Sequence, residues 1–193
     1  MIDFEQPANI VAPQLLGATI SHAGVTIRIT EVEAYLGTSD PASHTYRGMT
    51  KRNVAMFGPP ARLYVYRSYG IHLAGNIVCA PEGIGQACLL RAGEVIDGIP
   101  LALQRRGQMP FHRLAQGPGN LGAALALSLE LNKESIYGPL VQFTERSATP
   151  EIVRGPRIGI TKNTEAEFRF WIPNHASVSA RKGYPAQAEQ HGN

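Results

Sequence analysis

The segment Val25–Tyr35 constrains the fold most, because apolar residues occupy every second position of its first half. Val25, Ile27 and Ile29 alternate with polar residues, which is the period of a β-strand with one buried face. The segment therefore predicts a strand that ends just before a long loop.

The same predicted strand carries acidic residues in its second half. By the period of two, Glu31, Glu33 and Tyr35 continue the face that the apolar residues begin. A carboxylate directed toward a core costs free energy unless it is paired or used in function. A salt bridge to a nearby arginine is the structural alternative, and periodicity alone does not choose between Glu31 and Glu33.

The rest of the chain predicts further strands, helices and one long loop. Residues 37–61 are rich in Gly, Ser, Thr, Pro and basic residues, and a loop of this length inside a compact domain is usually functional. The whole pattern predicts an α+β fold, a single domain over residues 1–193 with a mostly antiparallel sheet and flanking helices. The other expected elements are a hairpin of 62–66 and 71–79, a strand over 86–91, helices over 94–106 and 120–129, strands over 157–160 and 167–172, a loose lead-in over 1–13 and a frayed tail over 181–193.

The composition is that of a folded domain. The chain has 193 residues, of which 44% are hydrophobic and 17% charged, values typical of one domain with a sizeable core. No apolar run approaches the roughly 20 residues of a membrane helix, and the first residues do not form a signal peptide. Cys79 and Cys88 flank a turn-like segment and are expected to be reduced core thiols. A cytoplasmic location follows, at the nucleoid if the protein is bacterial.

Basic residues are concentrated in the middle of the chain, although the net charge is only +3. Residues 1–40 have a net charge of −4, whereas residues 41–110 have a net charge of +5. Binding to a phosphate backbone requires a basic segment of this kind, but an ordinary solvated face has the same composition. The basic residues in question are Arg47, Lys51, Arg52, Arg62, Arg67 and Arg91.

Tyrosines cluster around the predicted hairpin. Tyr64 and Tyr66 share one strand face, an arrangement that is more often packing than a binding site. Tyr69 lies near the following turn beside Arg67, where packing explains a large ring less easily. A protruding side chain there is able to wedge into a base stack, and aromatic faces serve as platforms for bases.

Other motifs are weak or absent. No spacing among the histidines and cysteines matches a metal site, so no metal is expected. Gly117-Pro118-Gly119 precedes a predicted helix with Asn120 as its capping residue. Such a turn is able to bind phosphate through backbone N–H groups, but a bare connection between loop and helix is the commoner case.

Short blocks of residues spread over residues 14–180 match one known family in order and spacing. The blocks are Thr30-Glu31-Val32-Glu33-Ala34-Tyr35-Leu36-Gly37, Asp40, Ser43-His44, Arg52-Asn53, Met56-Phe57, Leu63-Tyr64-Val65-Tyr66, Tyr69-Gly70, Asn76, Leu89-Leu90-Arg91-Ala92 and Gly117-Pro118-Gly119-Asn120-Leu121. With these blocks in register, the chain resembles the alkyladenine (3-methyladenine) DNA glycosylase family. The resemblance implies one α+β domain around a curved antiparallel sheet, with no catalytic metal or organic cofactor.

The resemblance also implies roles in the chemistry and in holding the DNA open. Glu33 matches the family's general base, which activates the attacking water. Arg91 matches an arginine near that water, the catalytic carboxylate and the backbone phosphate. Tyr69 matches the side chain that fills the gap left in the duplex by the flipped nucleotide.

A second group of matched residues implies a pocket for the flipped base. Tyr35 and His44 match residues that stack on or contact the base, and Tyr64 and Tyr66 complete the pocket. Asn76 matches a residue of the pocket wall that discriminates against normal guanine.

Contacts to the DNA backbone are expected from basic and polar side chains. The residues expected there are Arg47, Lys51, Arg52, Arg67 and Asn120. The chain departs from the family pattern at Arg67-Ser68 and at His72, where relatives often have apolar or aromatic residues. It also has Asn120 where a lysine is common. These departures affect the expected phosphate contacts and lesion preference rather than the chemistry.

The function that the resemblance implies is removal of alkylated or deaminated purines from duplex DNA by a monomeric, monofunctional glycosylase. No lysine occurs in the matched motifs, so water is the expected nucleophile and no strand-cleaving step is expected. A non-catalytic nucleic-acid-binding module is one alternative, which would need the basic loop and the aromatics but not Glu33. A hydrolase of small nucleosides is the other, which would need the carboxylate but neither Tyr69 nor the basic loop.

Overall fold

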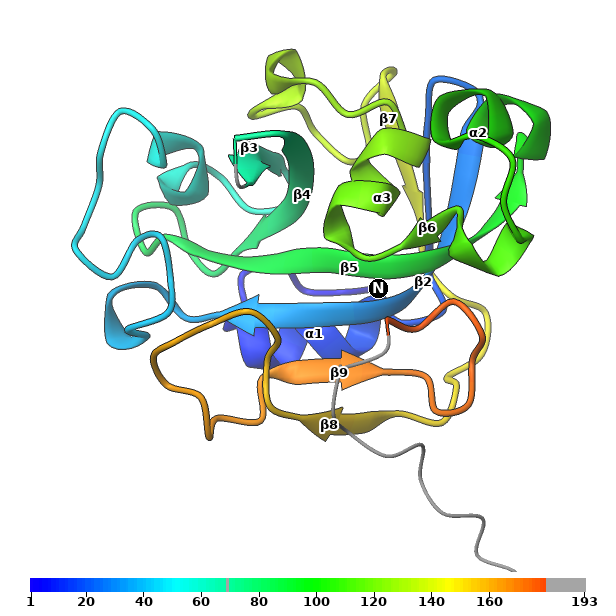
Figure 1. Ribbon diagram of the computed structural model, residues 1–193. Coiled ribbons are helices and arrows are strands. Elements are labelled where there is room, and N and C mark those ends of the chain that lie inside the picture. Colours follow the sequence, from blue (N-terminus) through cyan, green and yellow to red (C-terminus); the bar gives the residue numbers. More distant parts are fainter. Residues whose placement is uncertain (69, 180–193) are drawn as a thin grey trace, which may run out of the picture.

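A computed structural model describes residues 1–68 and 70–179 of the chain. In this part, an antiparallel sheet curls around an apolar core and is flanked by helices (Figure 1). The strands are β1 (Thr19–His22), β2 (Val25–Tyr35), β3 (Leu63–Ser68), β4 (His72–Cys79), β5 (Gln86–Asp97), β6 (Ala115–Gln116), β7 (Val141–Thr144), β8 (Val153–Gly155) and β9 (Arg169–Trp171). The helices are α1 (Ala8–Leu15), α2 (Ile99–Arg106) and α3 (Pro118–Ala124), with 3-10 turns η1 (Gly37–Ser39), η2 (Val54–Phe57), η3 (Phe111–Arg113) and η4 (Leu129–Leu131). The predicted α+β fold with a curved antiparallel sheet is confirmed.

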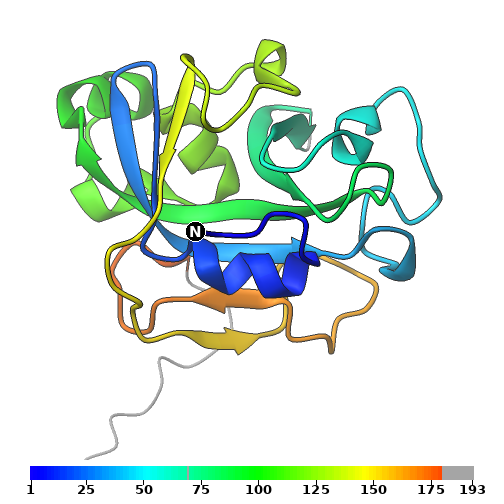
Figure 2. The same cartoon turned by 180° about the vertical axis from the view of Figure 1, so that it is seen from behind.

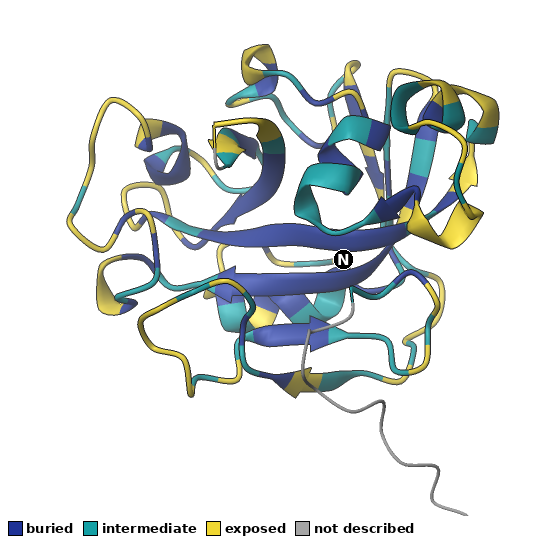
Figure 3. Ribbon diagram, in the orientation of Figure 1, coloured by how far each residue is buried: buried dark blue, intermediate teal, exposed yellow. Residues whose placement is uncertain are grey.

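The two longest strands, β2 and β5, pair along the middle of the sheet, whose order is β3-β4-β5-β2-β1-β7. β2 exchanges partners along its length, pairing with β1 in its first half and with β9 in its second. β5 likewise pairs with β4 first and with β6 later. Figures 1 and 2 show α1 on one side of this central pair and α3 on the other. Both central strands are buried along most of their length (Figure 3).

The apolar face of β2 changes halfway along the strand. In the first half of the strand, the odd positions Val25, Ile27 and Ile29 lie in the core. In the second half, the even positions Val32 and Ala34 lie there instead. The register between β2 and β5 shifts on both sides of residue 31, so a single period of two does not hold across the strand. The prediction that the two glutamates continue the aliphatic face is therefore wrong. They project from the other side of β2, where they are nonetheless fully buried.

Two predicted boundaries are corrected near the ends of the chain. The loose lead-in over residues 1–13 is wrong, because α1 spans Ala8–Leu15. Its buried residues, among them Val11, pack into the core, and such tertiary burial stabilises a short helix even with Pro13 inside it. The strand expected over 157–160 is also wrong, because β8 lies earlier, at Val153–Gly155. The tail over 181–193 lies outside the described residues.

Both predicted helices are shorter than expected. β5 continues to Asp97, and α2 begins only after Gly98. Gly98 has φ of 75°, and a Cβ there would lie 2.1 Å from the carbonyl oxygen of Gly24, so a side chain is excluded at this turn. α3 begins earlier than predicted, with Gly117 as its N-cap, so that Asn120 lies inside the helix and does not cap it.

The two cysteines lie on the neighbouring strands β4 and β5. Both are buried and neither forms a disulfide, which confirms the prediction of core thiols. Burial raises the pKa of the Cys88 thiol.

Candidate active site

One row of cross-strand neighbours crosses the sheet at the predicted site. Tyr64 on β3 pairs with Asn76 on β4, and Asn76 pairs with Leu89 on β5. Leu89 in turn pairs with Glu33 on β2, and Glu33 pairs with Arg169 on β9. Residues directly opposite each other project from the same face of a sheet. The sheet thus places Glu33, Asn76 and Tyr64 on one face although they are distant in sequence.

The Glu33 carboxylate is fully buried and is held by three groups. Its Oε1 accepts a hydrogen bond of 2.7 Å from the backbone N–H of Ile158. Its Oε2 accepts a hydrogen bond of 2.9 Å from the Tyr35 hydroxyl. Arg91 completes the set with an ion pair, in which Nη1 lies 3.3 Å from Oε1. The carboxylate therefore has a defined orientation on the face that also carries the tyrosines.

Arg91 links the two glutamates of β2. Besides its ion pair with Glu33, its Nε donates to Glu31 Oε1 over 3.2 Å. Burial alone would lower the pKa of Arg91, but the charges of Glu33 and Glu31 outweigh it and raise the pKa above its ordinary value. The guanidinium therefore stays charged between the two carboxylates.

Glu31 belongs to a different environment from Glu33. Its carboxylate accepts from Arg91, from Arg169 and, over 2.7 Å, from the backbone N–H of Ser179. Glu31 is thus hydrogen-bonded to two arginines and a backbone amide. It fits the structural alternative, in which a buried acid of this strand forms salt bridges with arginines.

His44, Tyr64 and Tyr66 form an aromatic group, and Tyr64 lies on the same face of the sheet as Glu33. The rings of Tyr64 and Tyr66 are stacked, with centroids 5.6 Å apart and planes at 19°. His44 lies edge-on to Tyr66 at 4.5 Å, and its Nδ1 is 3.2 Å from the Tyr64 hydroxyl oxygen. Burial raises the pKa of Tyr64 to about 12. Desolvation and the charge of Arg52 lower the pKa of His44, so the imidazole is neutral near pH 7.

The remaining pocket candidates, Tyr35 and Asn76, are fixed by neighbours. The Asn76 side-chain amide donates to the Tyr64 carbonyl oxygen over 3.0 Å. The Tyr35 ring is covered on one face by the guanidinium of Arg157, whose Cζ lies 4.6 Å from the ring centroid. Burial, together with the charge of Glu33, raises the pKa of Tyr35. Its hydroxyl thus stays protonated and donates to Glu33.

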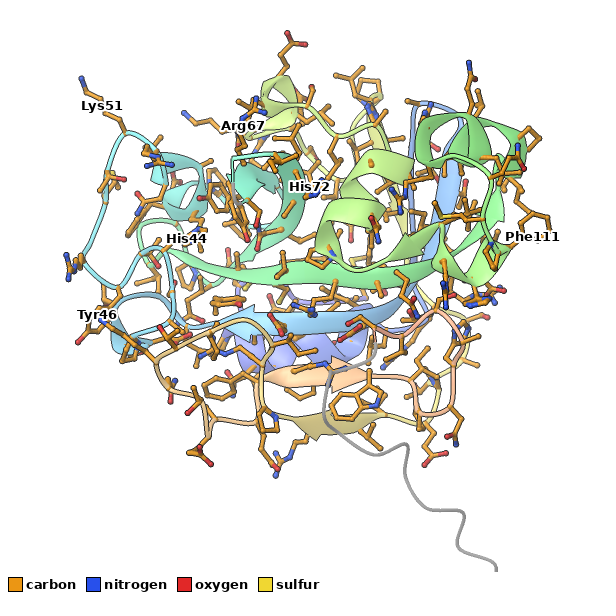
Figure 4. All side chains as sticks on the ribbon, viewed as in Figure 1. His44, Tyr46, Lys51, Arg67, His72 and Phe111 are labelled. Atoms are coloured by element: carbon orange, nitrogen blue, oxygen red, sulfur yellow. The ribbon has the colours of Figure 1, made fainter. Side chains whose placement is uncertain are left out.

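Most of the residues that are expected to contact phosphate are exposed and lie near the aromatic group. Arg47, Lys51 and Arg52 are exposed on the loop after β2, and Arg67 is exposed near the end of β3. In Figure 4, Lys51 and Arg67 point away from the body of the molecule, whereas His44 lies nearer the sheet.

A further predicted residue, Asn120, lies apart from this basic loop. Asn120 is on α3 and is half-buried. Its side-chain amide donates to the Gln116 carbonyl oxygen over 2.6 Å. Tyr69 lies outside the described residues.

The family model described as Methylpurine-DNA glycosylase (MPG) matches residues 2–176. The chain belongs to the methylpurine-DNA glycosylase family. A protein from Corynebacterium glutamicum named "Putative 3-methyladenine DNA glycosylase" is 65% identical over 187 residues, which cover 96% of this chain and 99% of that protein. Relatives of the same name from Corynebacterium efficiens and Cutibacterium acnes are 62% and 51% identical, covering 95% and 93% of this chain and 97% and 98% of their own length. The resemblance found in the motifs is thereby confirmed.

Two further side chains of this glycosylase family member reach the site, although the sequence does not predict them there. Arg157 forms a bidentate ion pair with Asp40, at 2.6 and 2.8 Å, and Arg169 pairs with Glu31. Asp40 is part of the family match, but the sequence assigns it no role. These contacts join residues 117 and 138 positions apart, and no local pattern signals a contact at such a separation.

Neither a metal cluster nor a membrane-spanning helix occurs within residues 1–68 and 70–179. In these segments, no group of three or more His, Cys, Asp or Glu side chains is placed to hold a metal ion. Within the same described part of the chain, no helix has the length and apolar character needed to cross a bilayer.

Proposed function

We propose that this protein is a monofunctional DNA repair glycosylase that hydrolyses the N-glycosidic bond of alkylated purines, such as 3-methyladenine, and leaves an abasic site. The observation that carries the proposal is the buried Glu33 carboxylate on the same face of the sheet as Tyr64, whose ring stacks on that of Tyr66. Such a carboxylate takes a proton from water and stabilises the oxocarbenium-like sugar. Glu33 is the better candidate for this role, because one arginine and two neutral donors hold it, whereas two arginines hold Glu31.

The aromatic group supports recognition of a damaged base. A glycosylase has to take its target out of the stack, which costs a few kcal/mol and least for damaged or poorly paired bases. A methylated purine is cationic, and an aromatic face attracts a cation by about 0.5–2 kcal/mol. Tyr35, His44 and Tyr66 are the faces proposed for this stacking, with Asn76 discriminating against normal guanine. A neutral His44 adds no charge repulsion against a cationic base.

The duplex itself is proposed to be held by the exposed basic loop and by Tyr69. The role of Tyr69 as the side chain that fills the gap stays a prediction from the family match. Because the proposed substrate is DNA, the proposed place of action is the nucleoid, where the protein would act as a monomer.

One assay tests this function against both alternatives. Free base is measured after incubation of the protein with an alkylated duplex, and in parallel with free alkylated nucleoside. Release from the duplex alone supports the glycosylase. Binding without release would indicate a binding module, and equal release from free nucleoside would indicate a nucleoside hydrolase.

We expect DNA binding to weaken steeply with salt. Replacing Arg47, Lys51, Arg52 or Arg67 singly by Gln should flatten the slope of log affinity against log salt by roughly 0.9 for each phosphate that the side chain neutralises. The measurement is a titration of labelled duplex at several salt concentrations. Arg154→Gln is the control, because Arg154 is an exposed arginine outside the loop. A slope near zero for the wild type would contradict DNA binding itself.

His44→Ala is expected to weaken recognition of the lesion more than affinity for undamaged DNA, because phosphate contacts position the duplex while the pocket reads the base. The same result is expected for Tyr35→Ala. The check compares affinities for damaged and undamaged duplexes. His175→Ala is the control, because His175 lies outside the aromatic group, with its Nε2 3.6 Å from Glu94 Oε2. Equal decreases on both duplexes would rule out a pocket role.

A further inference from the structure

Arg157 is a buried arginine whose guanidinium joins three parts of the site. It is only 2% exposed. Its Nη1 and Nη2 donate to the two carboxylate oxygens of Asp40 over 2.6 and 2.8 Å. Nη1 also donates to the Ala34 carbonyl oxygen over 2.9 Å. A bidentate pair of this kind fixes the orientation of the guanidinium plane as well as its position.

The guanidinium plane lies against the ring of Tyr35 and also near that of Phe168. Cζ of Arg157 is 4.6 Å from the Tyr35 centroid and 5.4 Å from the Phe168 centroid. The hydroxyl of the same Tyr35 ring donates to Glu33 Oε2. The stacking of Arg157 therefore restricts where that hydroxyl can lie.

The next residue of the chain supplies the second hydrogen bond to the carboxylate. The N–H of Ile158 donates to Glu33 Oε1 over 2.7 Å. Because Ile158 follows Arg157 directly, the bidentate pair with Asp40 also holds this backbone amide in place. Residues 156–160 belong to no helix or strand, so no regular backbone pairing holds the amide instead.

Asp40, the ion-pair partner of Arg157, is itself held by several other groups. Its carboxylate also accepts from the backbone N–H groups of Leu36 and Ala42 and from the Asn163 side chain. Burial alone would raise the pKa of Asp40, but hydrogen bonds from Arg157 and Asn163 outweigh it and the pKa lies below its ordinary value. The pair is thus charged at neutral pH and connects the end of β2, the loop that follows it and the segment that follows β8.

We propose that Arg157 is a positioning residue for Glu33: it holds both the Ile158 amide and the Tyr35 hydroxyl, which donate to the two oxygens of that carboxylate. Arg157 acts on the carboxylate through these two donors. The inference rests on the proposed role of Glu33 as the base. Without the positioning, a carboxylate of the right chemistry would have the wrong orientation, and a misplacement of about 1 Å is able to cost up to roughly 10²-fold in rate.

The test is single-turnover excision from an alkylated duplex as a function of enzyme concentration. Arg157→Lys keeps the charge opposite Asp40 but lacks the planar, bidentate geometry. The double variant Asp40→Asn/Arg157→Met removes both charges, so that no carboxylate is left buried without a partner. For both variants we expect the rate at saturating enzyme to fall by about 10-fold or more, while the half-saturating concentration changes by less than about three-fold.

Arg154→Lys is the matched control. Arg154 lies three positions earlier and forms an exposed ion pair with Glu167 at 3.1 Å, so both parameters should equal those of the wild type. The proposal is overturned if folded Arg157→Lys keeps a saturating rate within about two-fold of the wild type, or if rate and half-saturation change together. Loss of cooperative unfolding in both variants would also overturn it, because Arg157 would then be a purely structural residue.

Wild type and Glu33→Gln are run in the same series. Absence of excision by the wild type would refute the proposed function, and full activity of Glu33→Gln would refute the proposed role of Glu33 as the base. Failure of the Arg157 inference alone would leave both of those controls as expected, so the two failures are distinguishable.

Discussion

Glu33→Gln is expected to reduce base excision by about 10²-fold or more while it retains binding to lesion-containing DNA. The amide has nearly the shape of the carboxylate, but it neither takes a proton from water nor stabilises a positive charge on the sugar. The measurement is single-turnover release of base from an alkylated duplex, alongside the affinity for the same duplex.

Glu94→Gln provides the control for this result. Glu94 is a glutamate of β5 whose ion pair with Arg28 is exposed, and its replacement should leave excision unchanged. If Glu33→Gln excised base within a few-fold of the wild type, Glu33 would be ruled out as the base and Glu31 would become the candidate.

Arg91→Met is expected to destabilise the protein by about 3–5 kcal/mol, because removing one member of a buried ion pair leaves charge without compensation. Arg91 is 7% exposed and contacts both Glu31 and Glu33. Without it, Glu33 keeps only neutral donors and Glu31 keeps Arg169. The free energy of unfolding from urea titration measures the destabilisation.

Two comparisons show whether charge is the cause. Arg154→Met removes an exposed ion pair and should cost at most about 1 kcal/mol. Adding Glu33→Gln to Arg91→Met removes the acid that is left with only neutral donors and should recover part of the stability. A destabilisation below about 1 kcal/mol for Arg91→Met would mean that the two carboxylates do not depend on this guanidinium.

The buried charges around Glu33 balance one another among the described residues. The acids are Glu31, Glu33 and Asp40, and the bases are Arg91, Arg157 and Arg169. A buried ion is costly unless it is paired. This balance explains how the Glu33 carboxylate is accommodated although it is buried.

Local patterns in the sequence were sufficient for the main strands and for the family. Alternation predicted β2 with the bounds that the structure has, and the turn residues predicted the β3–β4 hairpin. The motifs singled out Glu33 and Arg91, and the structure places the two side chains in contact. These predictions succeeded because strand period and motif spacing are properties of neighbouring residues.

The tertiary structure decided which face of β2 carries the acids and how the two glutamates differ. The register shifts around residue 31 occur in the pairing of β2 with β5, and periodicity within β2 contains no information about them. Helix α1 forms around Pro13 because the core buries one side of it.

The contacts between Asp40 and Arg157 and between Glu31 and Arg169 were likewise invisible in the sequence. Each joins residues more than 100 positions apart, and only chain folding brings such residues together. The sequence by itself thus determined which chemical groups are available and in which strands they lie. The packing of β2 against β5, β9 and the segment after β8 determined which carboxylate is held by two arginines and which is held by the Tyr35 hydroxyl and the Ile158 amide.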